Sequence, residues 1–276
     1  MAIGDVGDHG GPIIERAQLF IRLRGAGWLT GPFKSSDALT AFEATVASPY
    51  LSSLVQYRGV RRTKIIDFQL DPTDMGALGP DPRKFVAGNV FLIPDADIQK
   101  VVVDMANSQP QPLQDDKNFI FMVVISQDPI PIVPEQSNAS GYHQSFITDD
   151  KRTLHYAVLL NQSSNELDHT WHYLPGVFSH ELVESCTDPD PPGGFLFQDG
   201  DEICDLNDQR HVNLIGLDHE VDLAAYQSQL EQKAVVPTAY SLRIALGKRP
   251  TDIVPSVKAL INQKSMLAAI LARCNP

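Results

Sequence analysis

The run at residues 118–125, Asn-Phe-Ile-Phe-Met-Val-Val-Ile, constrains the fold of this chain more than any other stretch. Every residue after Asn118 is apolar, and the β-branched and aromatic types in it favour strands. A strand without alternating polar residues is buried on both of its faces. The run therefore predicts a strand in the middle of a mixed sheet.

Other patterns fill out one α/β (α+β) domain. Strands are expected at residues 13–23, 60–70, 89–94 and 154–160. Helices are expected at residues 35–48, 51–57 and 95–105, and a hairpin at 210–221 is followed by helices at 224–233 and 253–273. No break in composition divides the chain, so residues 1–276 are predicted to form a single domain.

Residues 176–189 contain the motif that most directly suggests a function. Ser179 is a candidate N-cap, and Pro189 is a candidate stop for a helix between them. On such a helix His180 and Glu184 project from one face, about one turn apart. This is the spacing of H-E-x-x-H, in which two histidines bind zinc and the glutamate between them is a general base. Glu184 replaces the second histidine here, and a carboxylate oxygen is also an accepted zinc ligand.

An acid-rich loop follows this helix and offers further ligands. Residues 199–206 read Asp-Gly-Asp-Glu-Ile-Cys-Asp-Leu, with a glycine turn near the start. Glu202 is the first choice for a third ligand, and Asp205 is either a hydrogen-bonding partner of a ligand or an alternative ligand. Asp188 is expected to cap or orient the helix end, with metal ligation as the alternative. A solvated helix face beside an acidic turn explains each piece without a metal.

Two more side chains have expected catalytic roles. Glu181 would lie beside the metal, where it can deprotonate a bound water. His143 follows Gly141 and Tyr142 in a predicted turn, where it is a third ligand, an oxyanion-stabilising group or simply a hydrogen-bonded loop histidine. Among the thiols, Cys186 and Cys204 form either one disulfide or a pair of reduced core side chains.

The net charge of the chain limits the kinds of binding partner to expect. The chain has 22 Lys and Arg against 34 Asp and Glu, a net charge of −12. This argues against nucleic acid or an anionic membrane surface and suits metal cations. No apolar run approaches the roughly 18 residues of a transmembrane helix, and the polar N-terminus lacks the features of a secretory signal. We expect a cytoplasmic protein, or a secreted one if a leader has been removed.

Together these stretches resemble the bacterial and fungal zinc-peptidase-like relatives of the plant EXORDIUM (phosphate-induced protein) family. The resemblance is carried by residues 10–14 with Trp28, 48–57, 141–143 with 155–158, 179–189 and 199–206. It covers about residues 10–210, which leaves the hairpin and C-terminal helices of residues 211–276 outside. Phe195 or Phe197 replaces a tryptophan usual in the family, and Asn207 stands where a cysteine often follows. The resemblance implies a zincin-like domain, with a metal-ligand helix packed on a mixed sheet.

Two classes of function remain open. The first is a metal-dependent hydrolase of peptide or small amide-containing substrates, with zinc bound by His180 and Glu184. Its third ligand would be Glu202 or His143, and its base would be Glu181. An anionic ligand weakens zinc as a Lewis acid, so an isomerase or cyclase is a variant of this class. The second is a non-catalytic module for carbohydrate or protein. Its acidic side chains either bind Ca²⁺, with His180 outside the site, or bind no metal.

Overall fold

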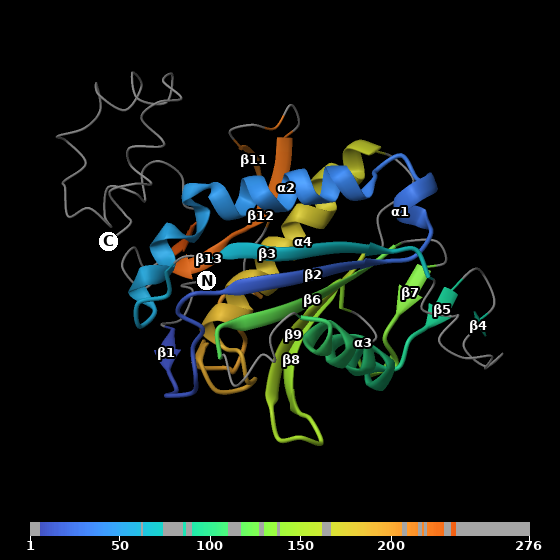
Figure 1. The fold of residues 1–276 in the computed structure, drawn as a ribbon. Helices are drawn as coiled ribbons and strands as arrows, with labels where there is room; N and C mark the ends of the chain where they lie inside the picture. The colour runs from blue at the N-terminus through green and yellow to red at the C-terminus, as the bar shows by residue number, and fades with distance from the viewer. Residues whose placement is uncertain are drawn as a thin grey trace.

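A five-stranded sheet in the order β3-β2-β6-β9-β8 forms the centre of the computed structural model (Figure 1). Its strands are β2 (Gln18–Arg24), β3 (Lys64–Asp71), β6 (Phe119–Ile125), β8 (Gly141–Ile147) and β9 (Thr153–Leu160). The first four in the sheet order run parallel, and the edge strand β8 is antiparallel to β9. The predicted α+β class with a mixed sheet is confirmed, and its zincin-like character stays a prediction. The structure describes residues 6–61, 63–73, 85–86, 90–109, 117–126, 130–136, 139–161, 167–205, 209–214, 217, 220–228 and 233–235.

Strand β6 occupies the middle of the sheet, as its apolar run predicts. Residues 120–125 are all buried. Successive side chains of a strand point to opposite faces: Ile120, Met122 and Val124 join one apolar cluster. Phe121, Val123 and Ile125 join the cluster on the other face. Both faces of the sheet are therefore covered.

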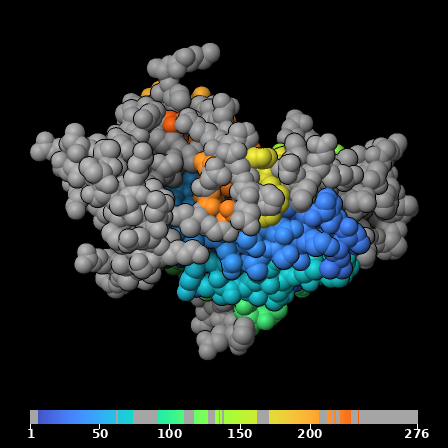
Figure 2. Space-filling view, turned by 90° about the horizontal axis from the view of Figure 1, so that it is seen from above, coloured from blue at the N-terminus to red at the C-terminus, as the bar shows by residue number. Residues whose placement is uncertain are grey.

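Helices form a layer on each side of the sheet (Figure 1). Helices α2 (Ser35–Ala47) and α4 (Leu167–Thr187) lie on one face, and α3 (Asp95–Asn107) lies on the other. Phe42 of α2 stacks on Phe178 of α4 with ring centroids 4.1 Å apart. A view onto this face shows α2 in blue between the teal edge strand β3 and the orange residues that follow α4 (Figure 2). Helix α4 thus packs against α2 beside it and against strands β8 and β9 of the sheet.

Shorter elements surround this core. They are β1 (Gly7–Asp8) paired with β10 (Phe195–Leu196), the sheet β4 (Phe85–Val86), β5 (Val90–Leu92) and β7 (Ile130–Ile132), α1 (Gly27–Thr30), and the 3-10 helices η1 (Pro49–Gln56) and η4 (Pro134–Gln136). Strands β11 (Gln209–Asn213) and β12 (Glu220–Ala224) form the predicted antiparallel hairpin. No helix in the described part of the chain is long and apolar enough to span a bilayer.

Helix α4 begins earlier than the sequence suggests. It starts at Leu167 and includes Pro175, so the prediction of Ser179 as N-cap is wrong. Ser179 lies in the helix interior, where its hydroxyl donates to Gly176 O at 2.9 Å. A proline inside a helix costs one backbone hydrogen bond. Burial of the apolar side chains around Pro175 offsets this cost, notably Leu174 and Phe178, which are fully buried. The helix ends at Thr187, just before the predicted stop.

The predicted helix at residues 224–233 is also wrong. This part contains the end of β12 and the strands β13 (Tyr226–Ser228) and β14 (Lys233–Val235), which pair antiparallel. Residues 223–228 are all buried, which suits an extended segment covered on both of its faces better than a helix with one solvent-exposed face. The predicted helix at residues 253–273 lies outside the described residues.

Candidate metal centre

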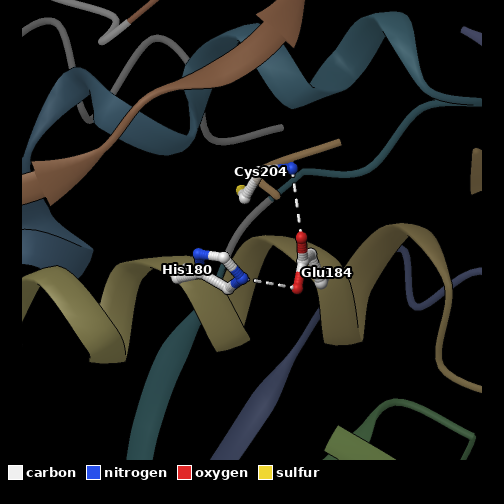
Figure 3. Close-up of side chains that lie close together, drawn as sticks. All are labelled: His180, Glu184 and Cys204. Carbon is white, nitrogen blue, oxygen red and sulfur yellow. Dashed lines mark hydrogen bonds and ion pairs between the residues drawn. The ribbon is translucent and has the colours of Figure 1, made fainter. Parts of the chain in front are cut away.

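His180 and Glu184 lie one turn apart on α4 and face each other, as their spacing predicts (Figure 3). His180 Nε2 is 3.0 Å from Glu184 Oε2. Glu184 is only 2% exposed. Burial raises the pKa of Glu184 to about 7, although the His180 imidazole lowers it. Burial lowers the pKa of His180, but the carboxylates of Glu184, Asp205 and Glu181 together outweigh this effect, so the pKa lies well above its ordinary value.

The acid-rich loop returns to this pair because other segments hold it in place. Gln227 N of β13 donates to Ile203 O at 2.9 Å. Ala224 N donates to Ser179 Oγ at 2.8 Å, which ties the same segment to α4. Tyr50 of η1 donates to Ala224 O at 2.7 Å. Residues 224–227 therefore fix the loop against the helix that bears His180 and Glu184.

Two carboxylates each have one oxygen held by a backbone N–H group and the other near His180. Cys204 N donates to Glu184 Oε1 at 3.0 Å (Figure 3). Glu202 N donates to Asp205 Oδ2 at 3.1 Å, and Asp205 Oδ1 lies 3.4 Å from His180 Nε2. The hydrogen bond from His180 lowers the pKa of Asp205. Such outer hydrogen bonds orient metal ligands in known sites.

Three groups of side chains in the described part of the chain have ligand atoms within 4.8 Å of one another and could hold a metal ion. They are His180–Glu184–Cys204, His143–Glu181–Glu184 and Glu184–Glu202–Asp205. Glu184 belongs to all three. The predicted ligands His180, Glu184, Glu202 and Asp205 are thus gathered at one place, and Glu184 lies at its centre.

The predicted catalytic residues, His143 and Glu181, lie next to each other and close to Glu184. His143 Nδ1 lies 3.5 Å from Glu181 Oε2, and His143 Nε2 lies 3.3 Å from Glu202 Oε1. Burial lowers the pKa of His143, but the Glu181 and Glu202 carboxylates outweigh it and raise this pKa well above its ordinary value. Beyond these contacts with His143, neither Glu181 Oε2 nor Glu202 Oε1 has a hydrogen-bond partner among the described residues, although both atoms are buried.

The prediction of a turn at His143 is wrong, because His143 lies within the edge strand β8. The sequence of β8, with a glycine and several polar residues, lacks the continuous apolar character of β6. Only Tyr142 and His143 of β8 are buried, so its other positions do not require apolar side chains. The sequence therefore does not indicate this strand, although it does indicate His143 as a site residue.

Cys204 is a possible ligand that the sequence did not suggest. Cys186 and Cys204 are both buried and free, so the alternative of a disulfide between them is wrong. Cys204 Sγ belongs to a candidate group with His180 and Glu184 (Figure 3). Burial raises the pKa of the Cys204 thiol well above its ordinary value. The only signal in the sequence was its position between Glu202 and Asp205.

Asp188 lies at the end of α4, where it shapes the turn that follows. Its Oδ1 accepts from Gly193 N at 3.0 Å and from Gly194 N at 2.7 Å. Its backbone oxygen is 2.8 Å from His143 Nε2. Asp188 is absent from the candidate ligand groups among the described residues. Its contacts are those of the residue expected to orient the helix end.

Replacing Asp188 with Ala should therefore weaken folding and leave metal binding intact. The change leaves the backbone N–H groups of Gly193 and Gly194 without an acceptor. Each unsatisfied N–H group costs about 1–3 kcal/mol of stability. We expect urea unfolding to show a loss of about 2–3 kcal/mol in the free energy of unfolding. Asp199→Ala, in an exposed turn, is the control. Loss of bound metal from a folded Asp188→Ala protein would instead make Asp188 a ligand.

Neither the known protein families nor the curated proteins give a match to this chain. What can be said of its class therefore rests on the geometry above. The chain has an α+β fold with a partly buried cluster of imidazole, carboxylate and thiol groups that could hold a metal ion. The resemblance to EXORDIUM relatives stays a prediction.

Proposed function

We propose that this protein is a zinc-dependent hydrolase of peptide or small amide bonds. The observation that carries the proposal is the arrangement of Glu184 Oε2 and Asp205 Oδ1 at 3.0 and 3.4 Å from His180 Nε2. With ligand bonds of about 2.0–2.1 Å, neighbouring ligand atoms of a tetrahedral zinc lie roughly 3.3 Å apart. The separations in the site are close to that value.

The charges of the cluster also favour a cation. Glu181 and Glu184 are 4% and 2% exposed, and Glu202 and Asp205 lie beside them. Burying carboxylates is costly unless they are paired or coordinate a metal. The two histidines supply at most two positive charges for these four acids. A divalent ion at Glu184 would offset the remainder.

The donor set favours zinc over calcium. Calcium takes oxygen ligands throughout, whereas zinc accepts imidazole, thiolate and carboxylate. His180 Nε2 faces Glu184 and Asp205, and Cys204 Sγ is close by. The carboxylates of Glu184, Glu202 and Asp205 by themselves favour a second candidate, a Ca²⁺-binding module. The two candidates differ in whether His180 is needed for binding.

Glu181 is the base in this proposal. It follows His180 directly on α4, and beyond the contact with His143 Nδ1 at 3.5 Å its buried Oε2 has no hydrogen-bond partner among the described residues. Zinc bound at His180 and Glu184 would act as a Lewis acid that polarises a carbonyl and acidifies water. Glu181 Oε2 would take the proton of the attacking water and pass it to the leaving nitrogen.

Chelation tests the proposal. The zinc-loaded protein is incubated with a mixture of casein peptides, and cleavage is followed by mass spectrometry. We expect cleavage to stop after dialysis against a chelator and to return with Zn²⁺ but not with Ca²⁺. Cleavage that survives chelation would contradict the proposal. Zinc binding without cleavage of any peptide would favour the isomerase or cyclase variant.

A further inference from the structure

We propose that the edge strand β8 positions the base Glu181, through Gly141 and His143. The inference rests on the proposed function, because it assigns a role to the side chain that acts there as base. Helix α4 packs against both β8 and β9. Glu181 is on the face of α4 that meets β8, since a carboxylate oxygen lies near His143 of that strand.

Gly141 allows the strand to lie directly against the Glu181 side chain. A Cβ atom at position 141 would be 2.6 Å from Glu181 Oε1, 2.9 Å from Glu181 Cγ and 2.7 Å from Val177 Cγ1. All these separations are shorter than the closest contacts that real Cβ atoms make. The requirement for glycine here is one of space. Any larger residue must move Glu181, Val177 or the strand itself.

His143 meets the other oxygen of the same carboxylate. It lies two residues after Gly141, so both residues are on the same face of the strand. Its Nδ1 is 3.5 Å from Glu181 Oε2. Its Nε2 is 2.8 Å from Asp188 O, and a carbonyl oxygen can only accept, so Nε2 carries a hydrogen in this contact. The bond to Asp188 fixes the imidazole ring, and the ring then limits where Oε2 can lie.

These contacts matter because a glutamate on a helix has several rotatable bonds. A catalytic group has to be held within about 0.5 Å of its productive position by packing and by outer contacts. Glu181 lies close to Gly141 of β8 on the side of Oε1, where no Cβ atom has room, and His143 lies on the side of Oε2. Gly141 and His143 are therefore positioning residues that act through Glu181.

The test uses Gly141→Ala in the protein loaded with Co²⁺, whose visible absorption bands report the surroundings of the bound ion. Gln144→Ala, on the opposite face of β8, is the matched control, and Glu181→Gln is the reference for a lost base. We expect Gly141→Ala to bind Co²⁺ as tightly as the original protein, within about threefold, and to change the bands in the same way as Glu181→Gln. Turnover of the casein peptides should fall by about 100-fold, the effect of a misplacement of about 1 Å.

Two variants of His143 test the same positioning role, and they remain informative if Gly141→Ala does not fold. His143→Ala should reproduce the change in the cobalt bands, and His143→Asn, which keeps a donor near the Nδ1 position, should largely restore them. Unchanged bands and turnover in Gly141→Ala and in His143→Ala would overturn the inference and leave the proposed function standing. If the original protein binds no Co²⁺ at all, the result would instead contradict the proposed function, and with it this inference.

Discussion

Replacing Glu184 with Gln is expected to lower the affinity of the protein for Zn²⁺ by about 1,000-fold. Structural zinc sites bind with about 10–16 kcal/mol, so one of three or four ligands contributes roughly 4 kcal/mol. Glu184 belongs to every candidate group of ligands. No other single change should weaken binding as strongly. A competition titration against a chromophoric chelator gives the two affinities.

Gln is chosen because it retains the amide oxygen that Cys204 N needs as acceptor at position Oε1. Burial raises the pKa of Glu184 to about 7, so a neutral side chain suits this position. The metal-free variant should unfold at a free energy within about 1 kcal/mol of the original. Glu43→Gln, at an exposed position of α2, is the control. Equal zinc affinities for Glu184→Gln and Glu43→Gln would show that Glu184 is not a ligand.

The same titration has an expected dependence on pH. The pKa of Glu184 is about 7, and that of His180 lies well above its ordinary value. Ligands must lose their protons before zinc binds. Protons therefore compete with zinc below these pKa values, and the measured affinity should rise between pH 6 and pH 8.

Replacing Glu181 with Gln is expected to lower the turnover of peptide cleavage by about 10²–10⁴-fold, the usual contribution of a general base. The amide has the shape of the carboxylate but cannot take a proton from water. The change should lower turnover and leave zinc affinity within about threefold, since Glu181 is not one of the side chains near His180 Nε2. Steady-state kinetics on a cleaved casein peptide provides the measurement.

Glu43→Gln again serves as the control for a glutamate of an exposed helix face. A Glu181→Gln variant that retains full turnover would remove Glu181 as the base. A variant that loses zinc as well would place Glu181 among the ligands, as the group His143–Glu181–Glu184 allows.

Strong local patterns of residue types predicted the centre of the fold and of the site well. The apolar run of β6 indicated a central strand, and β6 does lie in the middle of the sheet. The i, i+4 spacing of His180 and Glu184 indicated that their side chains meet, and they lie 3.0 Å apart. Both inferences depend only on local geometry. Local geometry is what a sequence encodes most directly.

The errors arose where tertiary contacts outweighed local signals. Ser179 suggested a helix start, but burial of Leu174 and Phe178 lets α4 continue through Pro175 and Ser179. Residues 224–233 had a helical pattern, but hydrogen bonds from Gln227 to Ile203 and from Ala224 to Ser179 hold the first of them as strands. Such contacts join segments far apart in the sequence. A single sequence does not display them.

The candidate site contains features that the local sequence indicates and features that depend on tertiary contacts. Its helix and its acidic loop could be predicted, because their residue types suggest metal ligands directly. The closeness of Gly141 to Glu181, and the place of Cys204 beside His180, depend on how β8 and the loop pack on α4. No spacing in the sequence indicates either of them.

The central claim is that His180 and Glu184 belong to a transition-metal site. The most direct measurement is elemental mass spectrometry of the protein, purified without added metal or chelator, beside a His180→Ala variant. We predict about one zinc or other transition-metal ion per chain, and its loss in the variant. No bound metal, even after incubation with Zn²⁺ and desalting, would contradict the claim. Calcium alone, retained by His180→Ala, would contradict it equally and favour the calcium-binding module.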